Sequence, residues 1–300
     1  MLYKRNKERT LTQSQIDKRF GLSLVLPAIV IVIIIAVFPL CYALFLSFFK
    51  YELATSIPKK FVGLNNYIRV FSDARFWNAL KVTAIIVAGG IILQLAIGLI
   101  VALLLNKEFH GKKIVTAFLL IPSVIAPVVV GFIFRMMFND RYGPINYFLS
   151  LLHISPVSWL SKPIPSYFAV MLANAWEWFP FMMLMLLAGL QSISKDQMEA
   201  AELDGCNDLQ KFFYVTLPNL WNIILTVVLI RAIEDFKMFD LIWVLTAGGP
   251  GVATETLNIY TYKQGFNFFS IGYALALAVV QTVLTFFIVK TMYTRIKKKN

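Results

Sequence analysis

The sequence predicts an all-α membrane protein with six transmembrane helices. Of its 300 residues, 59% are hydrophobic and only 15% are charged, and the mean hydropathy is +0.72. Soluble domains are nearer half apolar and about a quarter charged. The apolar excess lies in six runs, each long enough for the roughly 20 residues with which a helix crosses a bilayer. The runs are 21–49, 80–105, 114–138, 166–190, 219–243 and 270–293.

The first run is expected to stay as a helix rather than to be removed as a signal peptide. Its apolar stretch is longer than the roughly 7–15 residues of a signal peptide's hydrophobic region, and no small-residue cleavage site follows. Pro27 and Pro39 are expected to kink this helix. Membrane helices tolerate such prolines because their neighbours satisfy the freed carbonyl groups.

The basic residues indicate the orientation of the chain. With the N-terminus in the cytoplasm, 16 Lys and Arg residues fall on the inner segments and 10 on the outer ones. The positive-inside rule then predicts that both termini are cytoplasmic. We therefore expect a cytoplasmic segment 1–20, one membrane domain 21–293 and a basic tail 294–300 that meets an anionic leaflet. The net charge of +12 is accounted for in this way and does not favour nucleic acid as a partner.

The sequence contains no arrangement of residues for metal binding or catalysis. Cys41 and Cys206 fall in different parts of the scheme, and His110 and His153 stand alone in separate loops. The phosphate-binding pattern G-x-x-x-x-G-K-[S/T] is missing, and Gly111-Lys112-Lys113 is its nearest fragment. The chain is therefore expected to bind no cofactor of its own and not to be an enzyme.

The inner segment between the fourth and fifth runs is predicted to form two short capped helices. Ser194 is expected to cap the first, with Gln197 as its capping-box partner. Asn207 or Asp208 is expected to cap the second, which closes at Leu217-Pro218. A loop with this much local structure is a candidate docking surface.

This segment, 191–218, resembles the signature E-A-A-x3-G-x9-I-x-L-P of the permease subunits of binding-protein-dependent ABC importers, with valine in place of isoleucine. The matching residues are Glu199, Ala200, Ala201, Gly205, Val215, Leu217 and Pro218. Further segments are similar to the carbohydrate-uptake branch of that family, and to the first of its two paired permeases. They are Phe38-Pro39-Leu40, Gly63-Leu64-Asn65-Asn66-Tyr67 and Thr246-Ala247-Gly248-Gly249-Pro250.

The resemblance implies a type I ABC importer permease fold in a bacterial or archaeal cytoplasmic membrane. It also implies the partners: a second permease subunit, two ATPase subunits (identical or different) that bind ATP and Mg, an extracellular solute-binding protein, and a sugar as cargo. In the family the inner segment forms the coupling helix, which lies in a cleft of the ATPase. The docking residues implied here are Glu199, Ala200, Ala201, Glu202, Asp204, Gly205, Leu217 and Pro218.

Each residue type suits this docking. The two alanines allow close approach, and Gly205 permits a sharp bend. Glu199 and Glu202 share a helical face and are expected to meet basic groups of the ATPase.

Polar residues within the fourth and fifth runs form a candidate substrate site. Charged residues inside a span usually face the bundle interior or a water-filled path. The spacing i, i+3, i+4, i+7 places two sets on one face of each helix. The sets are Asn174, Glu177, Trp178 and Phe181 on the fourth run, and Arg231, Glu234, Asp235 and Met238 on the fifth. Carboxylates and amides bind hydroxyl groups, while aromatic rings cover the apolar side of a sugar ring. Family members that bind sugar within the membrane use these two helices.

Three alternatives remain open from the sequence. Arg231 and Glu234 could be an internal ion pair rather than substrate contacts. The cargo could be an amino acid, a peptide or an oxyanion. The chain could also be a secondary transporter coupled to protons through Glu177 or Asp235, and uptake without any ATPase would identify it as one.

Overall fold

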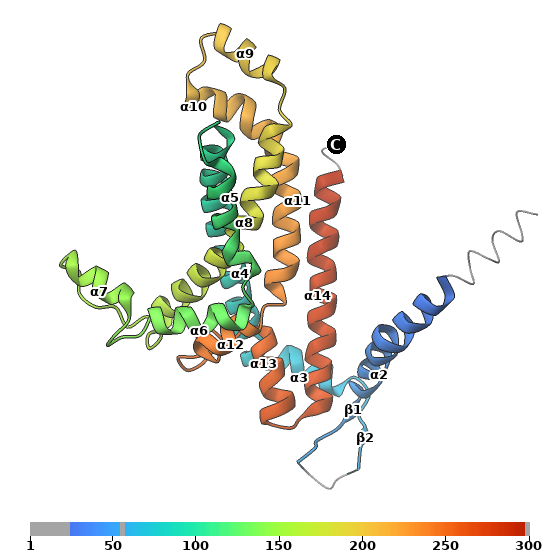
Figure 1. Ribbon diagram of the computed structural model, residues 1–300. Helices are drawn as coiled ribbons and strands as arrows, with labels where there is room; N and C mark the ends of the chain where they lie inside the picture. Colours follow the sequence, from blue (N-terminus) through green and yellow to red (C-terminus); the bar gives the residue numbers. More distant parts are fainter. Residues whose placement is uncertain (1–24, 55–57, 298–300) are drawn as a thin grey trace, which may run out of the picture.

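The computed structural model describes residues 25–54 and 58–297, and most of them form long helices (Figure 1). The predicted segment 1–20 and the last residues of the predicted tail, 298–300, lie outside the described residues. Five described helices are long and apolar enough to cross a membrane, and a bent pair brings the number to six if it counts as one span. The five are Val25–Leu46, Ala74–Asn106, Pro163–Gln191, Asp208–Phe236 and Ile271–Thr291. The predicted fold class is confirmed.

The elements follow one another with short connections. In chain order they are η1 (Ile33–Val37), α2 (Phe38–Leu46), β1 (Phe49–Lys50), β2 (Lys60–Phe61), α3 (Asn65–Ser72), α4 (Ala74–Asn106), α5 (Lys112–Leu120), η2 (Ile121–Val124), α6 (Pro127–Met137), α7 (Pro144–Leu151), α8 (Pro163–Gln191), α9 (Lys195–Leu203), α10 (Asp208–Lys211), η3 (Phe212–Thr216), α11 (Leu217–Phe236), α12 (Asp240–Thr246), α13 (Leu257–Tyr262), η4 (Lys263–Asn267) and α14 (Ile271–Lys297). The two short strands pair antiparallel, with Phe49 opposite Phe61.

The helices α4, α5, α8, α11 and α14 form a bundle (Figure 1). At one end, here called the α9 end, lie α9, α10 and the last turns of α14, whereas α3, α12 and α13 lie at the opposite end. The helices α4 and α8 pack closely, since a Cβ added to Gly98 would lie 2.7 Å from Met182 Cβ and 3.0 Å from the Met183 backbone nitrogen. A glycine at this position therefore lets the two longest helices touch.

The third predicted span, 114–138, is not a straight helix. Its first part, α5 with η2, meets α6 at an angle of 96°. Ile125 and Ala126 are extended between them, as expected for residues that lead into Pro127. After the turn α6 packs against α12, where Gly131 faces Val244. The predicted run is therefore a bent pair of helices, because prolines divide it.

The fifth predicted span, 219–243, begins earlier than expected. One continuous helix runs from Asp208 to Phe236, so the second short helix of the loop does not close at Leu217-Pro218. Pro218 clashes in a regular helix with the carbonyl four residues before it. The wider π turn of η3 accommodates it. The π turn η1 precedes Pro39 in the same way, within the continuous helix Val25–Leu46.

The same helix also ends earlier than expected. Asn258 Nδ2 donates hydrogen bonds to the carbonyl oxygens of Phe236 (3.1 Å) and Met238 (3.4 Å). Gln281 Nε2 in turn donates to Asn258 Oδ1 at 2.7 Å. These bonds satisfy carbonyl groups that a helix end leaves free. The chain then turns, and α12 starts at Asp240.

A buried ion network joins the loop after α12 to the start of α4. Arg75 donates two hydrogen bonds to the Glu255 carboxylate (2.6 and 2.8 Å), and Lys263 Nζ donates a third at 2.8 Å. Glu255 has an exposed fraction of 0%. Burial raises the pKa of Glu255, but the hydrogen bonds and charges of Arg75 and Lys263 outweigh it, so this pKa lies below its ordinary value.

We expect Glu255→Gln to lower the free energy of unfolding of the detergent-solubilised protein by about 1–3 kcal/mol at pH 7, because two cations lose their carboxylate. Thermal unfolding followed by size-exclusion chromatography measures it. The folded-state pKa is depressed, so the contribution is present above about pH 4.3 and is lost as the pH falls through the folded-state pKa. The difference between wild type and variant should therefore shrink below about pH 4.

Glu108→Gln is the matched control, because it breaks the exposed pair with Lys112, in which the Glu108 side chain is 88% exposed. Such pairs contribute about 0–1 kcal/mol. Equal losses from both variants would contradict a structural role for the buried network.

Candidate substrate cavity and docking loop

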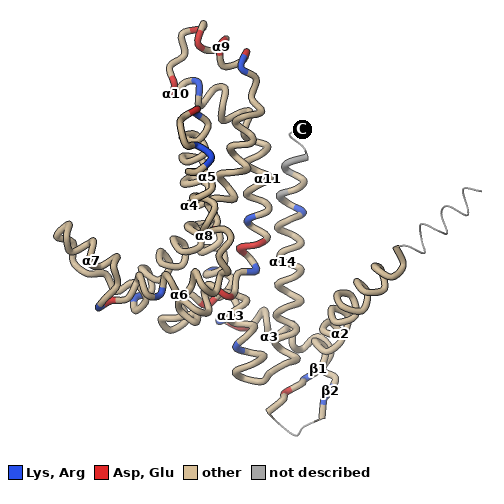
Figure 2. Tube along the Cα trace, in the orientation of Figure 1, with Lys and Arg blue, Asp and Glu red and all other residues tan. Residues whose placement is uncertain are grey.

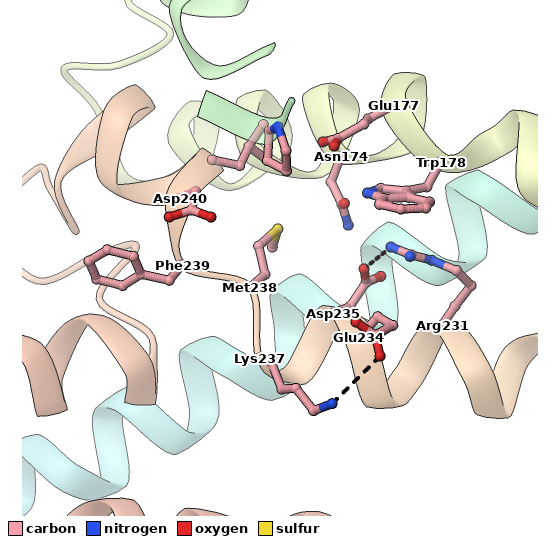
Figure 3. Close-up of a pocket in the computed structure, with 12 residues that line it drawn as sticks. Asn174, Glu177, Trp178, Arg231, Glu234, Asp235, Lys237, Met238, Phe239 and Asp240 are labelled. Atoms are coloured by element: carbon pink, nitrogen blue, oxygen red, sulfur yellow. Dashed lines mark hydrogen bonds and ion pairs between the residues drawn. The ribbon is translucent and has the colours of Figure 1, made fainter. Parts of the chain in front are cut away.

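A cavity of about 190 Å³ lies between α8, α11 and the start of α12 (Figure 3). Seven of the eight residues predicted as substrate contacts line it: Asn174, Glu177, Trp178, Arg231, Glu234, Asp235 and Met238. Phe181 does not, because it packs against the apolar cluster that contains Ile91 and Val227. Lys237, Phe239 and Asp240 complete the polar and aromatic lining. Charged residues are sparse along the long helices except near the end of α11 that leads to α12, as Figure 2 shows.

The cavity borders a buried ion pair. Arg231 Nη2 donates to Asp235 Oδ1, and both side chains are almost completely buried. Arg231 Nε also donates to Gln94 Oε1 (3.0 Å), while Gln94 Nε2 donates to Asp235 Oδ2 (3.0 Å). The three side chains therefore form a closed ring of hydrogen bonds between α11 and α4.

The alternative of an Arg231–Glu234 pair is wrong. The Glu234 side chain is 56% exposed and lies 3.5 Å from Lys237 Nζ. Asp235, one residue further along the helix, points towards α4, where Gln94 fixes it (Figure 3).

Gln94 is a partner of the buried ion pair that the spacing argument on the fourth and fifth runs did not find. The sequence carries one signal for it: Gln94 is a lone amide side chain within the second apolar run, 80–105.

One face of the Trp178 ring is covered by Arg231 of the ion pair. The Arg231 guanidinium carbon lies 4.1 Å from the ring centroid, a cation–π contact. The predicted stacking of a sugar on Trp178 is therefore restricted to the rest of the ring. Apolar surface also comes from Met238 and from Phe239, which sequence reasoning left out of the site.

Two buried polar atoms of the cavity have no hydrogen-bond partner among the described residues. They are Glu177 Oε1 and Asn174 Nδ2, and both side chains are at most 2% exposed. Leaving such an atom unsatisfied costs about 1–3 kcal/mol. Gly90 of α4 makes room for Asn174, because an added Cβ would lie 3.1 Å from Asn174 Nδ2 and 3.9 Å from Asp235 Oδ2. These atoms and the space around them fit a polar ligand.

The docking segment forms the helix α9 and the turn after it. Gly205 has a φ of +80°, where a side chain would be strained, and Cys206 N donates to the Ala201 carbonyl across the turn. Ser194 Oγ caps α9 by accepting from Asp196 N. The capping box predicted with Gln197 is not formed, since Gln197 accepts from Asn219 instead.

The predicted cap of the next helix is Asn207. It forms a complete capping box with Gln210, in which each side chain bonds the other residue's backbone nitrogen.

The two acidic residues of the docking face are not equivalent. Glu199 is exposed, whereas Glu202 accepts a hydrogen bond from Lys211 Nζ at 2.9 Å, and Lys211 also pairs with Asp208. Glu202 was expected to meet a basic group of another protein, and in this structure a basic group of its own chain already occupies it. A hollow of about 760 Å³ separates α9 from the ends of α4 and α8.

Of the remaining docking residues, Ala201 is buried while Ala200 and Asp204 are exposed. Leu217 and Pro218 lie in the first turn of α11 rather than on α9.

A bundle of membrane-length helices with a polar cavity inside it and a structured loop protruding from one end defines a membrane permease. The chain belongs to the family of binding-protein-dependent transport system inner membrane components, which matches residues 94–299.

Curated relatives match almost the whole chain. It is 36% identical to a trehalose/maltose transport system permease protein of Thermococcus litoralis, over 94% of this chain and 96% of the relative. It is 34% identical to a sulfoquinovosyl glycerol transport system permease protein of Agrobacterium fabrum, over 93% and 91%.

The fold is similar to a chain of a bacterial ABC transporter that imports the acidic polysaccharide alginate. The TM-score is 0.80, with 21% identity, and the match covers 95% of this chain and 98% of that one. A second structure of a bacterial alginate transporter, with a TM-score of 0.78 and 21% identity over 93% and 94% of the two chains, holds an alginate pentasaccharide-bound periplasmic protein.

We expect the double change Arg231→Met with Asp235→Met to be tolerated better than either single change, because each single change leaves one ion buried and unpaired. Breaking such a pair costs about 3–5 kcal/mol, while replacing both partners with apolar residues is often neutral. Thermal unfolding midpoints of the three purified variants test this. A double variant whose unfolding midpoint falls by the sum of the two single-variant decreases would contradict the pairing.

Proposed function

We propose that this chain is the permease subunit of an ATP-driven importer and carries a sugar through the cavity between α8 and α11. The unsatisfied Glu177 Oε1 and Asn174 Nδ2 carry the proposal, because they offer an acceptor and a donor to hydroxyl groups in a space that also holds Trp178 and Phe239. Binding sites of this kind combine apolar walls with a few placed polar groups. The names of the two permease relatives, one for trehalose and maltose and one for sulfoquinovosyl glycerol, support a sugar.

The proposed partners follow from the family and from the surfaces of the chain. Two ATPase subunits bind ATP and Mg and dock on α9, so this chain itself is not an enzyme. A second permease pairs with it, which is supported by the helix Val25–Leu46, because that helix leaves the bundle and is exposed along almost its whole length (Figure 1). An extracellular solute-binding protein delivers the sugar, as supported by the periplasmic protein bound to the alginate transporter.

The docking loop provides the test of ATP coupling. In vesicles that contain the assembled importer, Glu199→Lys and Gly205→Ala should each reduce ATP-driven sugar uptake at least about tenfold, equivalent to roughly 1.4 kcal/mol at the interface. The first reverses an exposed charge of α9, and the second strains the turn at φ +80°. Co-purification of the ATPase should fall in parallel.

A charge reversal at the same end, Lys113→Glu, serves as control because Lys113 is exposed on α5 and does not line the hollow beside α9. The docking role would be refuted by normal uptake in both loop variants. Uptake by the chain alone, without ATPase, would instead identify a secondary transporter.

The orientation is tested separately. In a background without Cys41 and Cys206, a cysteine replacing Leu203 on α9 should react with an impermeant maleimide only from the cytoplasmic side. A cysteine replacing Val252, at the opposite end, should react only from outside. Both positions are exposed, so access decides the labelling. The reverse pattern would place α9 outside the cell and rule out the ATPase interface.

A further inference from the structure

The walls of the cavity carry more acidic than basic groups. Four acids and two bases line it, which gives a formal charge of −2. The acids are Glu177, Glu234, Asp235 and Asp240, and the bases are Arg231 and Lys237.

Both bases are already engaged. Arg231 pairs with Asp235, bonds Gln94 and covers one face of Trp178. Lys237 Nζ lies 3.5 Å from the Glu234 carboxylate. An anionic ligand that entered this cavity would therefore have to compete with protein carboxylates for each cation.

The acids that remain are Glu177 and Asp240, and neither has an ion-pair partner among the described residues. Glu177 is only 2% exposed, and its Oε1 accepts no hydrogen bond from any described residue. A hydroxyl or an ammonium group can donate a hydrogen bond to this oxygen. A carboxylate or sulfonate group has no proton to donate to this oxygen, and it would enter a lining of formal charge −2 whose two cations are already paired with carboxylates.

The size of the cavity limits what it holds at one time. Its volume of about 190 Å³ is smaller than the roughly 300–1,000 Å³ of typical sites for drug-sized ligands. One sugar ring is the appropriate unit, so the substituents of a single ring meet Glu177 and Asn174.

We propose that this cavity accepts a ring that is neutral or carries an amine and rejects a ring that carries a carboxylate or sulfonate, and that Glu177 makes this distinction. The inference rests on the proposed function and specifies the class of sugar. Asn174 offers its amide as a donor to a ring hydroxyl, whereas Glu177 sets the permitted charge.

The test uses the purified importer, assembled with its second permease and ATPase subunits but without the solute-binding protein, which would impose its own selectivity. Equilibrium dialysis measures the binding of three labelled probes that differ in one substituent: methyl glucoside, methyl glucosaminide with a protonated amine, and methyl glucuronide. The glucoside and glucosaminide should bind at least about tenfold more tightly than the glucuronide, the ratio that corresponds to roughly 1.4 kcal/mol.

Two variants assign the discrimination to Glu177. Glu177→Gln should bring the three affinities within about threefold, whereas Glu177→Asp, which keeps the charge, should preserve the preference. Asp140→Asn is the matched control, since it removes one carboxylate from an exposed loop outside the cavity and should leave the ratios as in wild type. Size-exclusion chromatography shows whether each variant assembles. If a variant does not assemble, the ratio of the glucoside and glucuronide affinities of the wild-type importer still tests the inference.

A glucuronide that binds wild type as tightly as the glucoside would overturn the inference, as would ratios unchanged by Glu177→Gln. Binding of none of the probes, together with ATP-driven sugar uptake by the complete importer, would also overturn it but leave the proposed function standing. Failure of the complete importer to take up any sugar would remove the proposed function itself.

Discussion

The burial of the Arg231–Asp235 pair constrains how three helices of the bundle are arranged. Removing two ionised groups from water costs several kcal/mol for each, unless hydrogen bonds replace those that water made. Gln94 of α4 supplies two such bonds and Trp178 of α8 covers the guanidinium. The need to satisfy this buried pair therefore restricts how α4, α8 and α11 lie relative to one another. Apolar residues often stabilise such a position as well or better, so the pair is better explained by the cavity beside it.

Helical spacing predicted which side chains of α8 and α11 share a face, because that property is local. Asn174, Glu177 and Asp235 consequently line one cavity. Spacing could not choose between Glu234 and Asp235 as the partner of Arg231, since positions three and four residues apart are both neighbours on a helix. Gln94 makes the choice, and it is 137 residues from Arg231 in the chain. A contact of that range leaves no trace in a local pattern.

Hydropathy located the membrane helices but not their ends or bends. The run 114–138 is continuous in apolarity, yet the chain turns through 96° before Pro127. The run 219–243 contains no strong terminator, and the helix ends at Phe236 because Asn258, from a later segment, binds its carbonyl groups. Conversely, Leu217-Pro218 looked like a terminator, and the π turn before it lets the helix continue. The local sequence indicates where helices can end or bend, but tertiary packing and side-chain caps determine where they do.

The unbroken helix from Asp208 to Phe236 runs from the segment that contains α9 to the cavity. Its 29 residues span about 43 Å. Lys211 in its first turn pairs with Glu202 of α9, while its far end carries Arg231 and Asp235. A rod of this length cannot shorten, so a tilt of roughly 10° about its midpoint displaces its two ends by about 4 Å in opposite directions. A rearrangement small enough to leave every hydrogen bond of the rod intact is thus sufficient to move the cavity wall by more than the diameter of a water molecule.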